Sequence, residues 1–212
     1  MDPMKKVGQV LPATIALMLM GVVAPLHAQS LSQEKRTALE KVDELTADIE
    51  NIARTLWDYS ETALLEFQSA EFLSGLLEAE GFTVERGVAG MPTAFVASYG
   101  TGSPVIGVLA EFDALPGVGN APLPRKEVRA DGIQSGQGCG HNLFGAGSVG
   151  GAIAIKRAIE ALGLAGTIRL YGTPAEETVV GKVYMANAGL FDGLDAAIEW
   201  HPYLETAVNN NP

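Results

Sequence analysis

The chain has 212 residues, of which 47% are hydrophobic and 18% charged, and its formal net charge is −11. This composition is typical of a globular protein and excludes a largely disordered chain. The acidic balance argues against binding to nucleic acid or to anionic lipid, because both need clustered positive charge. A single cysteine, Cys139, excludes an internal disulfide framework and a Cys-x-x-Cys redox pair.

Residues 1–28 are predicted to be a secretory signal peptide. Two lysines precede an apolar stretch over residues 11–24, and a small residue, Ala28, comes before a polar segment. The stretch is short for a membrane-spanning helix, although an uncleaved N-terminal membrane anchor is the alternative. We therefore expect a mature chain from Gln29, a secreted or periplasmic location, and no stable membrane association after cleavage.

Residues 32–80 are predicted to be helical, with a break at Ser60–Glu61. Apolar residues recur every three or four positions in both parts, which is the spacing of a helix face turned toward a core. The residues of this expected core face are Leu39, Val42, Leu45, Ile49, Ile52, Leu56 and Tyr59, then Phe67, Ala70, Phe72, Leu73, Leu76 and Leu77.

After Gly81, short apolar runs alternate with helical segments, which predicts an α/β fold with helices on both faces of a sheet. The helix expected over residues 143–162 is rich in glycine and alanine, which permits close approach of neighbouring elements. The connection over residues 111–142 is long and rich in glycine and proline, and such connections are usually functional. Strands are expected over residues 82–85, 94–99, 105–110, 167–171 and 195–200, and a further helix over about 178–190.

Polar side chains follow three of these strands directly. Asp113 follows the third strand, the pair Glu176-Glu177 follows the fourth, and His201 follows the fifth. In open α/β sheets, ligands bind at the carboxyl ends of the strands, so we expect these groups to converge on one edge.

Cys139 and His141 lie two residues apart just before a helix, and on extended backbone such residues point the same way. Thiolate, imidazole and carboxylate are the ligands that zinc accepts, so the pattern favours a metal site. One alternative is that these are ordinary residues: a buried cysteine, a hydrogen-bonded loop histidine and a solvated glutamate pair. Another is a cysteine nucleophile at Cys139 with His201 as its base, which leaves the Glu176-Glu177 pair without a role.

Three sequence blocks, Ala110–Pro116, Gly138–Asn142 and Gly172–Glu177, resemble blocks of the metal-dependent amidohydrolases related to glutamate carboxypeptidase and aminoacylase. The similar branch is the one in which a cysteine is a metal ligand. The resemblance covers about residues 35–205, and three blocks in order are far more specific than one. It implies a mixed sheet sandwiched by helices, as in the dinuclear-metal aminopeptidase-like catalytic domains.

The resemblance also implies roles for individual residues. Glu176 matches the general base, and Asp113 matches an acidic residue that orients a metal ligand. Two divalent ions are implied in the full-length site, with zinc first and manganese or cobalt as alternatives. The implied reaction is hydrolysis of an amide bond in an N-acyl or N-aroyl amino acid, with p-aminobenzoyl-glutamate as one candidate. The metal ligands implied in this way are Cys139, His141, Glu177 and His201.

Members of this family are longer than this chain. After the block that matches His201 they insert a lid and dimerisation domain, and then they supply a last histidine ligand. We therefore expect residues 29–212 to be the N-terminal part of the catalytic domain, with a homodimeric full-length form. The alternative is an inactive truncated remnant, or a fragment that acts as a metal-binding or interaction module.

Overall fold

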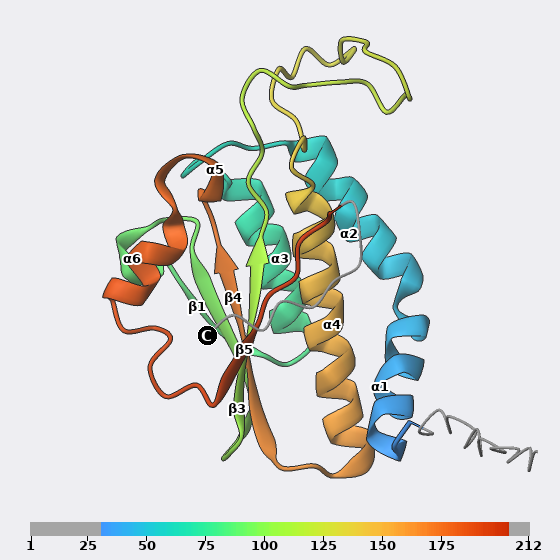
Figure 1. Ribbon diagram of the computed structural model, residues 1–212, viewed down its shortest axis with the longest axis vertical. Coiled ribbons are helices and arrows are strands. Elements are labelled where there is room, and N and C mark those ends of the chain that lie inside the picture. The colour runs from blue at the N-terminus through green and yellow to red at the C-terminus, as the bar shows by residue number, and fades with distance from the viewer. Residues whose placement is uncertain (1–30, 204–212) are drawn as a thin grey trace, which may run out of the picture. The chain divides into compact units, whose positions relative to one another are not determined.

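The structure is a computed structural model that describes residues 31–203, so the signal peptide expected over residues 1–28 lies outside the described range. Among the residues it describes, no helix has the length and hydropathy needed to cross a bilayer. Figure 1 shows a sheet against which the helices pack. The elements are α1 (Gln33–Glu44), α2 (Thr46–Tyr59), α3 (Phe67–Ala79), β1 (Thr83–Arg86), a short 3-10 helix (Val88–Gly90), β2 (Phe95–Thr101), β3 (Val105–Glu111), α4 (His141–Leu162), β4 (Gly166–Thr173), α5 (Glu176–Val179), α6 (Gly181–Asn187) and β5 (Ala196–Ile198).

The five strands form one mixed sheet in the order β1-β2-β4-β3-β5. Strands β3, β4 and β5 run parallel, whereas β1 and β2 join the sheet by antiparallel pairing. Glu111 at the end of β3 pairs in register with Thr173 at the end of β4. The carboxyl ends of the parallel strands therefore meet at one edge, and the predicted mixed α/β fold is confirmed.

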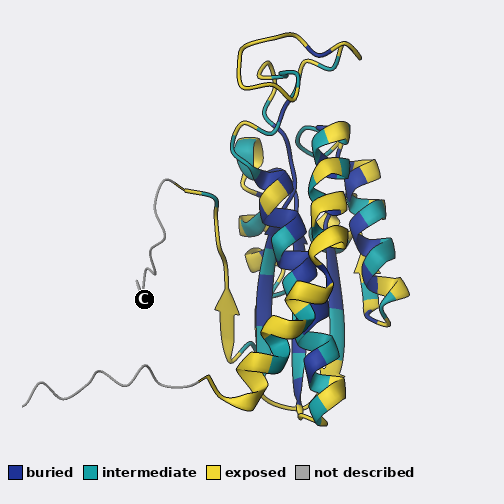
Figure 2. Ribbon diagram, turned by 90° about the vertical axis from the view of Figure 1, so that its right-hand side faces the viewer, coloured by how far each residue is buried: buried dark blue, intermediate teal, exposed yellow. Residues whose placement is uncertain are grey.

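Helices α1 to α4 cover one face of the sheet. Helix α4 contacts α1, α2, β3 and β4, so it lies at the centre of this layer. Figure 2 shows buried residues concentrated between these helices and the sheet. The buried residues of this core are Leu45, Ile52, Leu56, Leu73, Leu77, Phe82, Phe95, Ala97, Val108, Ala110, Phe112, Ala146, Val149, Ala152, Ile153, Ala154, Ile168 and Leu170.

The other face is covered less completely. A smaller core there centres on Tyr171 of β4 and Met185 of α6, against which Leu190, Phe191 and Leu194 pack. All three residues of β5 are exposed at the edge of the sheet (Figure 2). The helices therefore lie on both faces, as expected, but unequally.

Glycines on α4 allow its neighbours to approach closely, as the small residues of this helix predict. A Cβ added at Gly147 would lie 2.7 Å from Cζ2 of Trp200, and one at Gly150 would clash with Ile49 of α2. A Cβ at Gly151 would meet nothing within 4 Å. The close approach therefore depends on individual glycines.

The expected core face of the N-terminal helices is wrong at three positions. Leu39 is 52% exposed, Val42 36% and Phe67 54%. The helix is interrupted at Leu45, whose φ is −95° and ψ is 2°, so α1 is a separate helix and has no buried residue. Phe67 is the first residue of α3, and the buried apolar residues of that helix, such as Leu73, come later.

The helix expected over about residues 178–190 is in fact two short helices, α5 and α6. Val180 separates them with a φ of 53°, in the left-handed region that a β-branched residue rarely adopts. A Cβ added at Gly181 would clash with the carbonyl oxygen of Pro174, so the chain folds tightly back on itself. This turn follows α5, the short helix that comes after β4.

Candidate metal centre

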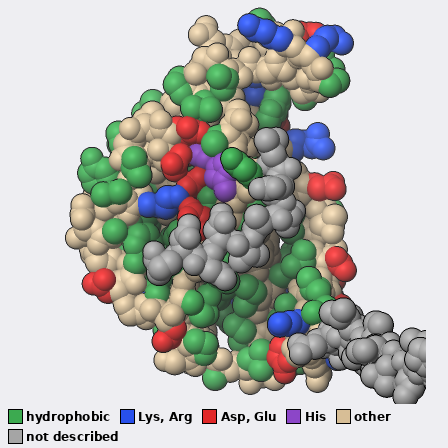
Figure 3. Space-filling view, viewed as in Figure 1, with side chains coloured by type: hydrophobic (Ala, Val, Ile, Leu, Met, Phe, Trp, Pro, Cys, Tyr) green, Lys and Arg blue, Asp and Glu red, His purple; other side chains and the backbone are tan. Residues whose placement is uncertain are grey.

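The residues predicted to carry chemistry converge at the carboxyl edge of the parallel strands. Asp113 follows β3, the Glu176-Glu177 pair follows β4, and His201 follows β5. Figure 3 shows histidine side chains among acidic side chains on one face of the molecule. The side-chain ligand atoms of Cys139, His141 and His201 all lie within 4.8 Å of one another, as do those of Glu111, His141 and Glu176.

His141 is the central residue of the site and is completely buried. Its Nδ1 lies 2.9 Å from Oδ1 of Asp113 and 3.1 Å from the Asp113 carbonyl oxygen. A proton on Nδ1 therefore donates to Asp113, and Nε2 faces the other side. There, Nε2 lies 2.9 Å from Oε2 of Glu111 and 3.9 Å from Oε1 of Glu177. Asp113 thus fixes the orientation of the imidazole ring.

Three buried polar atoms at this point have no hydrogen-bond partner among the described residues: Oε2 of Glu111, Nε2 of His141 and Oε1 of Glu177. The first two are close enough for a hydrogen bond, but their geometry does not satisfy one. Buried polar atoms are nearly always paired, so an unpaired cluster needs an explanation. An imidazole nitrogen and two carboxylate oxygens that face one space fit a divalent metal ion.

Cys139 and His201 lie at the exposed side of the same cluster. Sγ of Cys139 is 3.5 Å from Nε2 of His201, and Nδ1 of His201 is 2.9 Å from the carbonyl oxygen of Pro202. The expectation of extended backbone at Cys139 and His141 is wrong, because Gly140 has a φ of 84° and α4 begins at His141. This turn nevertheless directs both side chains to one site.

The position of His201 depends on the residue before it. Trp200 lies over Gly147 of α4 and packs edge-on against Phe144, with ring centroids 5.7 Å apart. The ring of His201 in turn lies 5.5 Å from that of His141, centroid to centroid. A glycine on α4 therefore provides the space that lets the chain after β5 reach the site.

The charges of the cluster shift the pKa of several of its groups. Although burial lowers the pKa of His141, the carboxylates of Asp113 and Glu111 raise it to about 10. Burial, and then the charge of Glu111, raise the pKa of Glu176. Burial, followed by Glu177 and the other carboxylates, raises the pKa of Cys139 to about 11. The site thus concentrates negative charge that a cation would balance.

Two residues of the site were not predicted from the sequence, Glu111 and Lys182. The ammonium group of Lys182 forms ion pairs with Glu111 and, at 2.6 Å, with Glu199. Burial raises the pKa of Glu111, but His141 and Lys182 lower it more, so the net shift is downward. Glu111 is the one charged residue of β3, and that contrast could have marked it. Nothing in the sequence marks Lys182.

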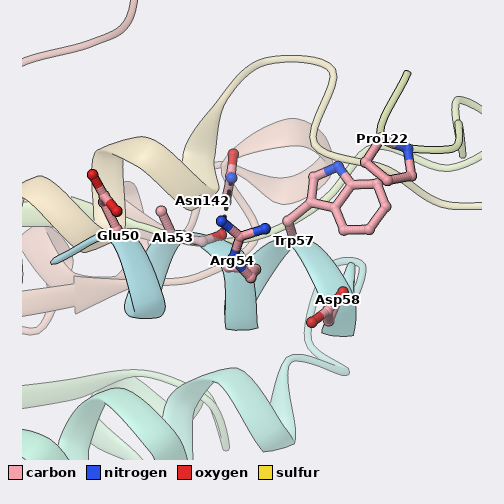
Figure 4. A pocket seen from close by; sticks show the side chains of 7 residues that line it. All are labelled: Glu50, Ala53, Arg54, Trp57, Asp58, Pro122 and Asn142. Atoms are coloured by element: carbon pink, nitrogen blue, oxygen red, sulfur yellow. Dashed lines mark hydrogen bonds between the residues drawn. The ribbon is translucent and has the colours of Figure 1, made fainter. Parts of the chain in front are cut away.

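A separate cavity of about 380 Å³ lies beside α2, away from the predicted residues. The side chain of Asn142 faces it and donates a hydrogen bond of 3.0 Å to the Ala53 carbonyl oxygen (Figure 4). None of the six residues predicted to carry chemistry lines this cavity, because they lie together at the carboxyl edge of the parallel strands. The lining residues are Glu50, Ala53, Arg54, Trp57, Asp58, Pro122 and Asn142.

Comparison with known proteins identifies the family. Residues 107–210 match the model of peptidase family M20/M25/M40. The chain belongs to this family. Among curated M20 relatives, it is 46% identical over 152 residues to one subunit of the p-aminobenzoyl-glutamate hydrolase of Escherichia coli, a match that covers 72% of this chain and 32% of that protein. It is 30% identical over 193 residues to Xaa-Arg dipeptidase of Mus musculus, which covers 85% of this chain and 41% of that protein.

Solved structures agree on the M20 fold. A dinuclear metal-binding M20 peptidase from Bacillus subtilis superposes with a TM-score of 0.61 at 24% identity, over 73% of this chain and 42% of that chain. An aminobenzoyl-glutamate utilization protein from Klebsiella pneumoniae gives 0.55 at 19% identity, over 77% of this chain and 46% of that chain. The M20 chain described here spans about a third of the length of the Escherichia coli relative and about two fifths of the mouse relative.

Proposed function

We propose that the chain carries the metal-binding edge of a metal-dependent amidohydrolase that cleaves the amide bond of an N-acyl or N-aroyl amino acid. The observation that carries the proposal is the cluster of unpaired buried atoms on Glu111, His141 and Glu177, with Cys139 and His201 beside it. The names of the relatives support the substrate class, since one is a p-aminobenzoyl-glutamate hydrolase and another an N-acetyl-L-cysteine deacetylase.

In this proposal four side chains hold divalent metal, with zinc as the first choice and manganese or cobalt as alternatives. Thiolate and imidazole ligands favour zinc, and the carboxylates are compatible with all three ions. The full-length site holds two ions. When bound, the metal supplies Lewis-acid chemistry, which polarises the scissile carbonyl and makes water more acidic. The four proposed ligands are Cys139, His141, Glu177 and His201.

Glu176 is the proposed general base. Its side chain is 35% exposed, so substrate and water reach it, and Oε2 lies 4.0 Å from Nε2 of His141. The upward shift of its pKa makes the carboxylate a stronger base. Glu176 takes a proton from the attacking water and later gives it to the leaving nitrogen. Asp113 keeps the His141 ring in place, because its carboxylate accepts from Nδ1.

The experiment that tests this proposal compares Glu176→Ala with the unaltered protein. The variant should keep its bound metal and lose amide hydrolysis by about 10²- to 10⁴-fold, the usual contribution of a general base. Unchanged hydrolysis by Glu176→Ala would reject the assignment. Metal binding without any hydrolysis by the unaltered chain would instead favour a metal-binding or interaction module.

A cysteine nucleophile is the second candidate, because Cys139 and His201 are 3.5 Å apart. Burial and the nearby carboxylates raise the pKa of Cys139 to about 11, which opposes the free thiolate that such a nucleophile needs, whereas a thiol that coordinates a metal ion loses its proton to the charge of the ion. This candidate also leaves the unpaired buried oxygen of Glu177, a proposed metal ligand, unexplained. Metal chelation separates the two, because it should stop the metal-dependent reaction and spare a cysteine hydrolase.

Export by a signal peptide over residues 1–28 and a homodimeric full-length form are further parts of the proposal. The charged and apolar pattern of those residues supports export. N-terminal sequencing of the secreted protein should give Gln29 as the first residue. Light scattering of the full-length protein should give the mass of a dimer.

A further inference from the structure

Glu66 is a buried carboxyl group with no role in the chemistry proposed above. It precedes α3 and is completely buried. Its Oε2 accepts a hydrogen bond of 2.8 Å from the hydroxyl of Thr93, and its Oε1 accepts one of 3.0 Å from the backbone N–H of Ala175. Within residues 31–203, no lysine, arginine or histidine forms an ion pair with it. Burial of a carboxyl group without a cationic partner costs folding free energy, so the two hydrogen bonds indicate a specific role for Glu66.

The contact with Ala175 is the informative one. Ala175 is completely buried and has a φ of 61°, in the left-handed region that a residue with a Cβ rarely adopts. It is also the residue before Glu176 and Glu177, so its conformation sets the direction of both carboxylates. The hydrogen bond from the Ala175 N–H to Glu66 helps to keep Ala175 in this strained backbone conformation.

A second carboxylate holds the same turn from the side of the metal cluster. Oδ2 of Asp113 accepts a hydrogen bond of 3.0 Å from the backbone N–H of Glu177. The turn over residues 175–177 is thus fixed at both ends, by Glu66 at Ala175 and by Asp113 at Glu177. Asp113 also hydrogen-bonds to His141, whereas within residues 31–203 Glu66 forms no hydrogen bond or ion pair with a proposed metal ligand.

We infer that Glu66 is a positioning residue, whose hydrogen bond to Ala175 aims Glu177 at the metal and Glu176 at the reacting water. The roles of Glu176 and Glu177 in this inference rest on the proposed function. The effect of Glu66 on the turn over residues 175–177 does not, because it can be measured in metal-free protein.

The test uses two substitutions of Glu66 in the whole chain. Glu66→Gln keeps an acceptor for the Ala175 N–H, and its amide nitrogen can donate to the hydroxyl of Thr93. Glu66→Met has a similar length and keeps neither acceptor. In metal-free protein, we expect hydrogen exchange of residues 175–179 to be faster in Glu66→Met and unchanged in Glu66→Gln. Zinc affinity should fall by about tenfold or more in Glu66→Met, and stay within about threefold in Glu66→Gln.

Glu61→Met is the matched control. Glu61 also binds the start of α3, where its carboxylate accepts the backbone N–H groups of Gln68 and Ser69 at 3.1 and 2.8 Å. Its loss should lower the melting temperature without changing exchange at residues 175–179 or zinc affinity. Should Glu66→Met fold poorly, adding Ala175→Gly removes the penalty of the left-handed conformation and should restore stability, but not affinity, because the turn stays free to move.

The inference would be overturned if Glu66→Met had the same zinc affinity, and the same hydrogen exchange at residues 175–179, as the unaltered protein. The unaltered chain could also fail to bind zinc while Glu66→Met still shows faster hydrogen exchange at residues 175–179. That result would support the role of Glu66 in fixing the turn and reject the proposed function. The two failures are therefore distinguishable.

Discussion

Asp113 lies between two residues of the proposed metal centre: its Oδ1 is 2.9 Å from Nδ1 of His141, and its Oδ2 accepts the backbone N–H of Glu177 at 3.0 Å. One buried carboxylate therefore sets the ring of one proposed ligand and the backbone of another. Both contacts come from Asp113, the second residue after β3, where the parallel strands end.

Replacing Asp113 with asparagine should weaken zinc binding by about 10- to 100-fold, as is usual when the residue that hydrogen-bonds a metal-bound histidine is replaced. The amide oxygen still accepts from Nδ1 of His141, but the amide nitrogen cannot accept from the N–H of Glu177. Calorimetric titration with zinc measures the change. Asp192→Asn, at an exposed position, is the control and should bind zinc as the unaltered protein does.

Alanine at two glycines of α4 should have opposite effects. Gly147→Ala places a Cβ 2.7 Å from Trp200, and displacement of the indole should cost about 1–3 kcal/mol and move His201 away from Cys139. Gly151→Ala meets nothing within 4 Å and should stabilise the helix by up to about 1 kcal/mol. Urea unfolding and zinc titration of both variants test this, and equal zinc affinity in the two would count against the role of Trp200.

The charge of Glu66 should make stability depend on pH. Burial raises the pKa of Glu66 above its ordinary value of 4.5, so the folded state binds the proton more tightly than the unfolded state does. Its stabilising contribution is complete below pH 4.5 and is lost as the pH rises through the raised pKa. Glu66→Gln does not titrate, so its free energy of unfolding, relative to the unaltered protein, should increase with pH over that window. A constant difference would contradict this.

We expect Arg129 to stabilise the long segment between β3 and α4, which extends away from the sheet at the top of Figure 1. Its side chain is 3% exposed, stacks 4.1 Å from the Trp57 ring centroid, and donates to the carbonyl oxygens of Trp57 and Asp58. Arg129→Lys should cost about 2 kcal/mol or more, because lysine lacks the planar fork that serves both carbonyls. Arg125→Lys, at an exposed position, should cost almost nothing in the same thermal unfolding experiment.

The sequence predicts much of the fold because apolar periodicity and glycine or proline boundaries act locally. Strands β2, β3 and β4 lie where short apolar runs indicate them. The break at Leu45 and the turn at Val180 do not follow from the local pattern, since both are apolar residues within a helical spacing and neither is a glycine or proline.

The six predicted site residues lie together because each follows a strand, begins α4 or comes just before α4, at one edge of the sheet. Glu111, Lys182 and Glu66 were missed for a different reason. Their importance comes from contacts between residues far apart in sequence, such as the 71 positions that separate Glu111 from Lys182. Although its charge within the apolar strand β3 could have marked Glu111, no periodicity or short motif encodes its pairing with Lys182.

Zinc binding by the unaltered chain tests the central claim most directly. After dialysis against zinc and removal of excess metal, elemental analysis should find zinc bound in a fixed ratio to the folded chain. His141→Ala, which removes the nitrogen at the centre of the cluster, should abolish that binding, and Cys139→Ser should weaken it. A folded chain that retains no zinc, or a His141→Ala variant that retains as much as the unaltered chain, would contradict the account.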